Sequence, residues 1–307
     1  MGIKQLDKFI KEYGVELKKW HISRLANKTI AIDTPGLIWR YLSASKKQLS
    51  MEYYHIQDRK IFTDFVVERI IRIDEMMGRY NINPIFVFDG NAPKEKGETH
   101  EKRAIPINKN KKDLDDNFSI ENIEKDVRFE EGEIKMIFDD LKERKVNVMI
   151  DKTREAECFC AKLCKTGKAD WILSYDSDSI AHLCPFMIRE LKGEYVFVVA
   201  LQTILRKLDL TKEQLQILCI FAGTDYNKNI YGIALKKAYI KLKDAEFNVE
   251  KMFKKLKKEG HDLSVLNYKR TYELFQSEKD EYFIKYDMDS HNNHDSNDSL
   301  ISNVEKN

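Results

Sequence analysis

Residues 28–44 read KTIAIDTPGLIWRYLSA, a short apolar run that ends at Asp33 and passes directly into a stretch of helical period. Near-continuous apolar runs of this length are typical of strands buried on both faces of a sheet. Four more runs of the same kind lie at residues 84–89, 146–151, 169–176 and 194–199. We therefore predict five buried strands.

Helical patterns lie between these runs, at residues 37–44, 62–80 and 155–168. Alternation of strands and helices is typical of parallel strands joined by crossover helices. The order of elements therefore predicts an α/β fold, with a mostly parallel central sheet and helices on both faces.

The composition of the 307 residues, 42% of them hydrophobic, is that of a globular enzyme or binding protein. The start MGIKQLDKFI lacks a signal-peptide core, and no apolar run approaches the roughly 20 residues of a membrane helix. The five cysteines are odd in number, and three fall within seven residues, which is a poor disulfide framework. We expect an intracellular protein with no membrane partner.

The cysteines also raise the question of a zinc site. Cys160 and Cys164 stand one helical turn apart, and His182 and Cys184 follow later in the chain. We favour a core role for these cysteines, because buried thiols usually act as small hydrophobic groups and no second CxxC-type pair exists.

Charge is unevenly distributed, although the formal net charge is only +2. Residues 228–258 contain ten lysines and three acidic residues, whereas residues 113–143 contain twelve acidic and four basic residues. A basic stripe favours a polyanionic partner, although many charge runs are only solvated surface.

Acidic residues stand at the ends of three predicted strands: Asp33, Asp89 and Asp176. Ligands of open parallel sheets bind outside the carboxyl ends of the strands, so these residues are expected at one edge. Asp178 follows Asp176 on the same loop. We therefore expect four carboxylates near one another.

Glu155 and Glu157 open the helix after the third strand. Acidic residues in a first helical turn also stabilise the helix dipole without any metal, so this pair alone does not decide between the two roles. If all these acids met at one site, however, the electrostatic repulsion between their charges would cost kilocalories per mole unless a cation were present. Mg²⁺ prefers carboxylates and water, and two such ions can promote hydrolysis of a phosphodiester.

Six segments resemble the flap endonuclease and XPG group of structure-specific nucleases. They are MGIKQL at the start, then IAIDTPGLIW, FVFDGNAPKEK, REAECFCAKL, ILSYDSDSIAH and LCIFAGTDYNKNIYGI, in the order of the family. The resemblance covers residues 1 to 245. It implies a PIN-like nuclease fold and hydrolysis of phosphodiester bonds in DNA, at 5′ flaps or free 5′ ends near a duplex junction.

The resemblance also assigns roles to individual residues. Seven acids would bind two Mg²⁺ ions, with manganese as a substitute: Asp33, Asp89, Glu155, Glu157, Asp176, Asp178 and Asp225. Lys96 and Arg103 match the two catalytic cations that engage the scissile phosphate, whereas on the residues alone both would be solvated loop cations. DNA-binding positions are Gly2, Trp39, Gly232, Lys236 and Lys237. On the residues alone, Trp39 is more often a core aromatic.

The sequence departs from the family in three places. The helix-two-turn-helix segment, which often binds potassium on backbone carbonyls, has Ala234 where the second glycine is usual, so potassium stays an open question. Residues 106–128, at the position of the helical arch, are poorer in basic residues. The stretch Gln276–Phe283 has Lys279 at an expected apolar position, so no sliding-clamp motif is convincing.

We expect a monomeric, compact member of the family, acting in the nucleus or at a site of viral DNA replication. Residues 1–286 would form one nuclease domain, followed by a disordered tail at residues 287–307. Its parts are an N-terminal region (1–105), the arch-like excursion (106–128), an internal nuclease region (129–225) and a basic, helical duplex-binding region (226–286).

Two rival functions stay open. A PIN-like ribonuclease acting on RNA would use a similar acidic pocket, but it would need neither Lys96 and Arg103 nor the duplex-binding lysines. A non-catalytic scaffold that binds branched DNA would have no reason to keep mutually repelling acids.

Overall fold

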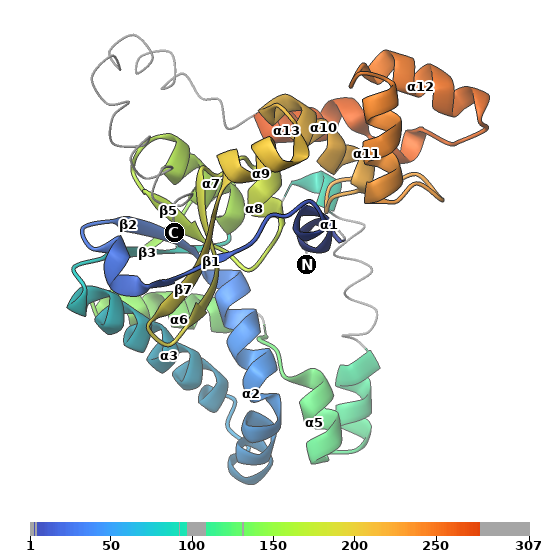
Figure 1. Cartoon of the computed structure of the whole chain (residues 1–307). Coiled ribbons are helices and arrows are strands. Elements are labelled where there is room, and N and C mark those ends of the chain that lie inside the picture. The colour runs from blue at the N-terminus through green and yellow to red at the C-terminus, as the bar shows by residue number, and fades with distance from the viewer. Residues whose placement is uncertain (1–2, 4, 92, 97–108, 131, 277–307) are drawn as a thin grey trace. The chain divides into compact units, whose positions relative to one another are not determined.

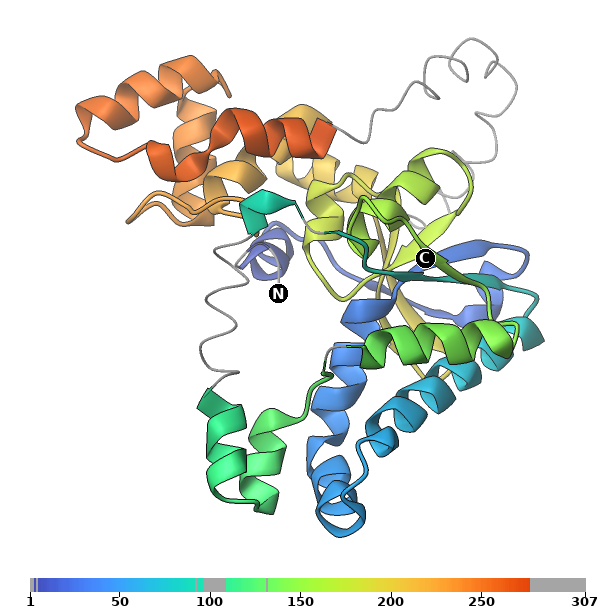
Figure 2. The ribbon, with the colours of Figure 1, turned by 180° about the vertical axis from the view of Figure 1, so that it is seen from behind.

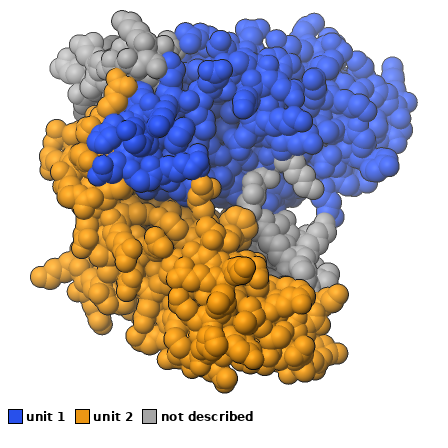
Figure 3. Space-filling model, turned by 60° about the horizontal axis from the view of Figure 1, so that its bottom comes forward, with its two compact units in different colours: residues 1–21, 157–307 blue, residues 22–156 orange. Residues whose placement is uncertain are grey.

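The computed structural model describes residues 3, 5–91, 93–96, 109–130 and 132–276 (Figure 1). The chain folds as two units (Figure 3). Unit 1 consists of residues 1–21 and 157–307, and unit 2 consists of residues 22–156.

Unit 2 is built on three parallel strands, in the order β2-β3-β4. These are β2 (Thr29–Asp33), β3 (Asn83–Phe88) and β4 (Val148–Ile150). Asp33 on β2 is paired with Val87 on β3, so the carboxyl ends of these two strands lie at the same edge. The acids that follow the two strands are thereby placed at one edge of unit 2.

Several helices belong to the described part of unit 2. They include η1 (Ile22–Leu25), α2 (Thr34–Ile56), α3 (Lys60–Arg79), η2 (Lys94–Lys96), α5 (Ile120–Asp126) and α6 (Glu133–Glu143). Helices α3 and α6 lie side by side (Figure 2). The predicted helices at residues 37–44 and 62–80 are confirmed as parts of α2 and α3.

Among its described residues, unit 1 contains four strands, in the order β1-β7-β6-β5. They are β1 (Lys18–His21), β5 (Trp171–Leu173), β6 (Phe186–Lys192) and β7 (Tyr195–Ala200). Strands β5 and β6 are parallel, whereas β7 is antiparallel to both β6 and β1. Trp171 is fully buried and contacts Trp20 and Phe186, with ring centroids 5.7 and 5.0 Å away.

The helices of unit 1 are α1 (Leu6–Glu12), α7 (Ala156–Lys165), α8 (Asp178–Ala181), α9 (Leu201–Leu208), α10 (Lys212–Ala222), α11 (Leu235–Asp244), α12 (Val249–Lys258), η3 (Ser264–Leu266) and α13 (Tyr268–Gln276); α7 begins on the last residue of unit 2. Helix α7 confirms the pattern at residues 155–168. Helix α10 is buried along its length from Leu215 to Ala222 and packs against α11 and α13 (Figures 1 and 2). The lysine-rich α11 and α12 each bury only an apolar stripe.

All five predicted strands are present within the predicted runs or one residue beyond them. The expected sheet was mostly parallel, and β7 is an antiparallel member of it. Only Gly193 and Glu194 separate β7 from β6, and so short a connection allows only an antiparallel pair. One expectation was wrong: strand β4 is not fully buried, since Met149 and Ile150 are 38% and 44% exposed.

The described part of the arch-like region, residues 109–128, contains helices. Residues 109–116 are helical, and α5 follows, with Ser119 capping it by accepting a bond from the Asn122 amide at 3.4 Å. The Asn122 side chain donates to the carbonyl oxygens of Asp113 (3.1 Å) and Asn117 (3.0 Å). Phe118 packs on Tyr54, with ring centroids 5.7 Å apart. Helices this short carry too few turns to show a period in the sequence.

In the part of the chain that the structure describes, every helix is too short or too polar to cross a bilayer.

Candidate metal centre

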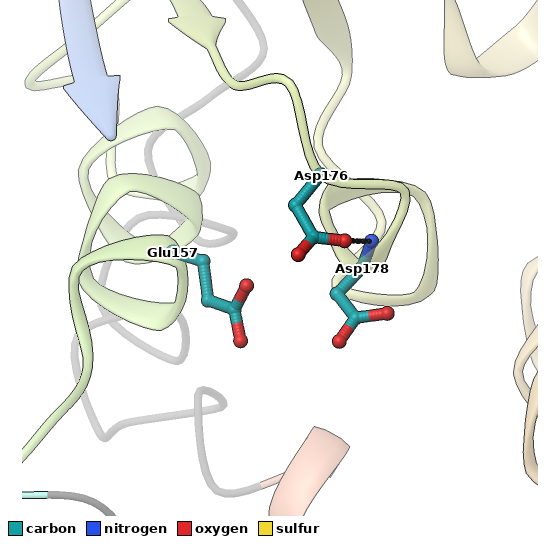
Figure 4. A group of neighbouring side chains, drawn as sticks. All are labelled: Glu157, Asp176 and Asp178. Carbon is teal, nitrogen blue, oxygen red and sulfur yellow. Dashed lines mark hydrogen bonds between the residues drawn. The ribbon is translucent and has the colours of Figure 1, made fainter. Parts of the chain in front are cut away.

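Three buried carboxylates come together in unit 1: Glu157, Asp176 and Asp178. One oxygen of each lies within 4.8 Å of the others. Glu157 stands in the first turn of α7, Asp176 on the loop after β5, and Asp178 at the start of α8. The Glu157 side chain faces the other two across a narrow gap (Figure 4).

Local hydrogen bonds hold the two aspartates in place. The Asp178 amide donates to Asp176 Oδ1 at 3.2 Å (Figure 4). The Asp176 amide donates to Ser174 Oγ at 3.1 Å. The Ile3 amide donates to Asp178 Oδ1 at 3.0 Å, and the Ser177 hydroxyl donates to the Ile3 carbonyl oxygen at 3.4 Å. The N-terminal segment therefore supports the loop that carries both acids.

Arg189 on β6 supports the same loop from inside unit 1. Its buried guanidinium donates to the carbonyl oxygens of Ser174 (3.0 Å) and Asp176 and to Ser179 Oγ (3.1 Å). It also pairs with Asp7 at 3.3 Å. Arg189 was not among the predicted site residues, although an arginine inside the apolar run FMIRELK is unusual.

Like charges this close repel by roughly 1 to 4 kcal/mol per pair, depending on the effective dielectric. Hard divalent cations remove that repulsion, and their preferred ligands are carboxylate oxygens. The three acids supply oxygen donors only, from separate elements that converge on one point. This donor set fits Mg²⁺ or Mn²⁺.

Unit 2 holds three of the remaining predicted ligands, each with a defined local role. Asp33 is the N-cap of α2 and accepts a hydrogen bond from the Gly36 amide at 3.4 Å. Asp89 Oδ1 accepts from the Ala156 amide at 2.8 Å, at the start of α7. Glu155, the third, precedes Ala156 directly. The structure therefore brings Asp89 beside the segment that carries Glu155.

Gly90 makes this approach possible. Its amide donates to the Arg154 carbonyl oxygen at 2.9 Å. A Cβ atom at Gly90 would lie 1.9 Å from the Asp151 carbonyl oxygen and 2.7 Å from that of Arg154. Only glycine fits between these two backbone segments.

Lys96 is not the solvated loop cation that its sequence alone suggests. It is buried in η2, and its ammonium donates to Glu155 Oε1 at 2.7 Å. Both side chains are about nine-tenths buried, at 10% and 8% exposure. A lysine held in this way places a positive charge beside a predicted metal ligand.

Asp151, the acid at the end of β4, serves its own loop. Its oxygens accept from the amide and hydroxyl of Thr153 (2.9 and 2.6 Å) and from Arg154 (2.8 Å). Burial alone would raise the pKa of Asp151, but these hydrogen bonds and the Arg154 charge lower it to about 2. The carboxylate therefore stays ionised and fixes the path from β4 to Glu155.

Asp225, the seventh predicted ligand, is half-buried and lies outside the cluster of three. Its loop is closed by Thr224, whose hydroxyl donates to Asn227 Oδ1 at 2.7 Å. The Asn227 side chain in turn donates to the Ile220 carbonyl oxygen at 2.8 Å.

Four of the five predicted DNA-binding residues are exposed: Trp39, Gly232, Lys236 and Lys237. Trp39 is 59% exposed, so it is not a core aromatic. Lys236 pairs with Glu12 at 3.4 Å, and the Lys237 ammonium donates to the Gly232 carbonyl oxygen at 3.1 Å. Gly2, Arg103 and most of the stretch Gln276–Phe283 lie outside the described residues.

The structure favours the core role of the cysteines. Cys160, Cys164 and Cys184 are buried, and burial raises the pKa of the Cys164 thiol to about 12. Within the described ranges, the residues grouped to hold a metal are the three acids of unit 1 alone.

Known proteins resemble this chain over most of its length. A probable RAD2-like endonuclease of Invertebrate iridescent virus 6 is 29% identical over 335 aligned residues, covering 90% of this chain and 79% of the relative. Flap endonuclease 1 of Candida dubliniensis is 29% identical, covering 80% of this chain and 68% of the relative.

Two solved structures share the fold. The catalytic core of Rad2 in complex with a DNA substrate matches with a TM-score of 0.58 at 18% identity, covering 90% of this chain and 80% of that one. Flap endonuclease-1 from Methanococcus jannaschii matches with a TM-score of 0.55 at 18% identity, covering 89% and 84%. The expected α/β nuclease fold is thereby confirmed.

Two family models also match the chain. The XPG N-terminal domain matches residues 1–112, and the XPG I-region matches residues 148–225. Together they cover more than half of the sequence, including all seven predicted acidic ligands. The chain therefore belongs to the flap endonuclease and XPG family.

Proposed function

We propose that this protein is a metal-dependent, structure-specific nuclease that hydrolyses phosphodiester bonds in DNA, at 5′ flaps or free 5′ ends near a duplex junction. The observation that carries this proposal is the meeting of Glu157, Asp176 and Asp178 within 4.8 Å. Family membership supplies the substrate class: one relative is named flap endonuclease 1, and the Rad2 core is described with a DNA substrate.

The site would take two Mg²⁺ ions, with Mn²⁺ as a substitute. Bound there, they would activate water for attack and stabilise the leaving oxygen. Glu157, Asp176 and Asp178 would supply ligands from unit 1. Asp33, Asp89, Glu155 and Asp225 would complete the set.

Chain connectivity supports a common role for the two glutamates. Glu155 and Glu157 are separated by Ala156 alone, which limits their Cα atoms to a distance of about 7 Å. The rest of the seven-acid assignment rests on the family motifs.

Two cations would act on the scissile phosphate. Lys96 is held by Glu155, so its ammonium is fixed beside that carboxylate rather than mobile in solvent. Arg103 has a planar guanidinium suited to two phosphate oxygens. Both would counter negative charge that develops as the phosphodiester is cleaved.

DNA would be bound by other residues. These are Gly2, Trp39, Gly232, Lys236 and Lys237, together with the lysines of α11 and α12. We place this activity in the nucleus or at a site of viral DNA replication, with the protein acting as a monomer and without a demonstrated sliding-clamp motif.

The direct test uses purified protein with end-labelled flap, nicked, single-stranded and RNA-flap substrates. We expect cleavage of the DNA flap near the junction, leaving a 5′ phosphate, with Mg²⁺ and not with EDTA. Preferential cleavage of RNA would favour the ribonuclease alternative. Flap binding without cleavage would favour the scaffold alternative.

Asp178→Asn tests the site itself. The substitution keeps the shape of the side chain and an oxygen for the Ile3 amide, but removes one ligand charge. We expect single-turnover cutting to fall by at least about 10²-fold, with flap affinity changed less than about three-fold.

Asp139→Asn on α6, which removes the same charge from an exposed surface, is the control. Full cutting by Asp178→Asn would reject the assigned centre.

A further inference from the structure

The turn that precedes α11 is closed by its own side chains. The Asn229 amide nitrogen, Nδ2, donates to the carbonyl oxygens of Ile230 (3.2 Å) and Ile233 (3.3 Å). Both carbonyl oxygens therefore point toward one place, and a neutral N–H donor of the chain occupies it.

Other donors use the remaining acceptor capacity. The Ile233 amide donates to the Ile230 carbonyl oxygen at 3.0 Å, so that oxygen accepts two hydrogen bonds, one for each lone pair. The Gly232 carbonyl oxygen accepts from the Lys237 ammonium at 3.1 Å. Three carbonyl oxygens of the turn are thus engaged by donors of the protein.

The backbone around Asn229 is closely packed. Gly223 has φ +89°, and a Cβ atom there would lie 2.9 Å from the backbone nitrogen of Asn229. Ile230 and Ile233 are 1% and 2% exposed and anchor the turn in unit 1, whereas Tyr231 between them is 96% exposed. The turn is therefore fixed from inside and presents its outer side to solvent.

A potassium ion bound to backbone needs several carbonyl oxygens that converge with lone pairs directed at the ion. The donor set here does not fit that requirement, because the converging oxygens already accept N–H groups. Potassium does not fit this turn because Asn229 and Lys237 already donate hydrogen bonds to the carbonyl oxygens. The replacement of a glycine by Ala234 is not the reason.

We propose that the Asn229 amide, assisted by the Lys237 ammonium, takes the place of a monovalent cation in this turn, so that the duplex-binding segment works without potassium. The proposal rests on the proposed function as a DNA nuclease. It assigns Asn229 a positioning role: it shapes the turn that leads into the lysines of α11.

The first test compares flap-DNA affinity in potassium chloride and tetramethylammonium chloride at equal ionic strength, in EDTA to prevent cutting. Because the phosphate contribution depends on ionic strength rather than on one cation, wild-type Kd values should agree within about two-fold. A wild-type affinity about ten-fold higher in potassium would overturn the proposal.

The second test uses Asn229→Ser, which removes the two N–H groups of Nδ2 and, with its shorter side chain, leaves space beside the two carbonyl oxygens. Loss of two hydrogen bonds predicts a Kd about ten-fold weaker in tetramethylammonium, with recovery in potassium. Asn229→Asp keeps the shape but replaces the donor with an anion, and should show a larger potassium effect. Asn147→Ser, an exposed change in unit 2, is the control.

The melting temperature supplies a readout without DNA. Potassium should raise the Tm of both Asn229 variants by mass action and leave that of the wild type unchanged. If the wild type binds no DNA in either salt, the proposed function fails while the Tm comparison still judges the turn. Variants that bind and melt like the wild type in both salts would reject the role of Asn229.

Discussion

At the scale of single residues, Gly90 packs closely against the backbone of Asp151 and Arg154. This contact helps to fix the position of the neighbouring Asp89. Gly90→Ala must separate two backbone segments, because the added carbon would overlap the Asp151 carbonyl oxygen. We expect a loss of at least about 2 kcal/mol in the free energy of unfolding, by steric strain that flexible side chains cannot absorb.

Urea unfolding measures this loss. Gly78→Ala is the matched control, because a Cβ atom there meets nothing within 4 Å. Equal stability of the two variants would show that the close contact is unimportant.

Arg189 gives a second prediction at this scale. Arg189→Lys keeps the charge, but a single ammonium cannot replace both Nη1, which donates to Ser174, Asp176 and Ser179, and Nη2, which pairs with Asp7. The loop that carries Asp176 and Asp178 should loosen, so we expect a higher Mg²⁺ concentration for half-maximal cutting and about a ten-fold lower rate. Flap affinity in EDTA should stay near wild type.

A purely structural role would lower the melting temperature without shifting the Mg²⁺ requirement of the folded fraction. Arg144→Lys, at an exposed ion pair on α6, should leave both quantities unchanged.

Sequence reasoning at this scale found acids more readily than their supports. The positions of Asp33, Asp89 and Asp176 at the ends of predicted strands were predictable, because strand ends are visible as the limits of apolar runs. Arg189 and Ile3 were not, because their roles depend on partners that are far away in the chain, at Ser174 and Asp178. Long-range pairing of this kind has no local signal.

At the scale of elements, the loop from β4 to α7 should respond to acid through Asp151. Its folded-state pKa of about 2 lies below the ordinary value near 3.9, so its stabilisation is complete above about pH 4 and is lost as pH falls toward about 2. Allowing for solvent screening at this loop, the contribution is about 1 kcal/mol.

Asp151→Asn should therefore be less stable than wild type near neutral pH, and the difference in the free energy of unfolding should narrow as pH falls from about 4 to about 2. Chemical denaturation across this range measures it. A difference that does not vary with pH would mean that the Asp151 charge is irrelevant to the loop.

Some helices and strands were not predicted because their sequences lack a clear hydrophobic pattern, and one turn signal in the sequence was not used. The antiparallel direction of β7 was not predicted, although GE between LK and YV is short enough for a hairpin. Strand β1, KKWH, has no apolar run to detect. The helix at residues 109–116 and α5 are mostly polar, and tertiary contacts such as Phe118 on Tyr54 contribute to their packing.

At the scale of the whole molecule, the near-zero net charge conceals a basic surface on unit 1. Helices α11 and α12 bury Leu242, Met252 and Leu256 and leave most of their lysines exposed. We expect flap affinity to fall steeply with salt, because each phosphate neutralised contributes about 0.9 to the slope of log K against log salt.

The triple variant Lys254→Gln, Lys257→Gln, Lys258→Gln should flatten that slope and leave the cutting rate of saturated complexes near wild type. Lys135→Gln with Lys142→Gln on α6 is the control on unit 2. A wild-type slope near zero would remove α11 and α12 from the DNA-binding surface.

The helix caps formed by Asp33 and Asp89 affect which residues would be retained as related proteins evolve. Both acids stabilise a helix start through a backbone amide, so selection for folding alone would retain them after catalysis had been lost. The presence of both residues in a distant homologue is therefore weak evidence that the homologue is an active enzyme. Substitution at Glu157 or Asp178 would be a better sign of a pseudoenzyme, because without a bound metal the repulsion within the cluster favours the loss of one of its charges.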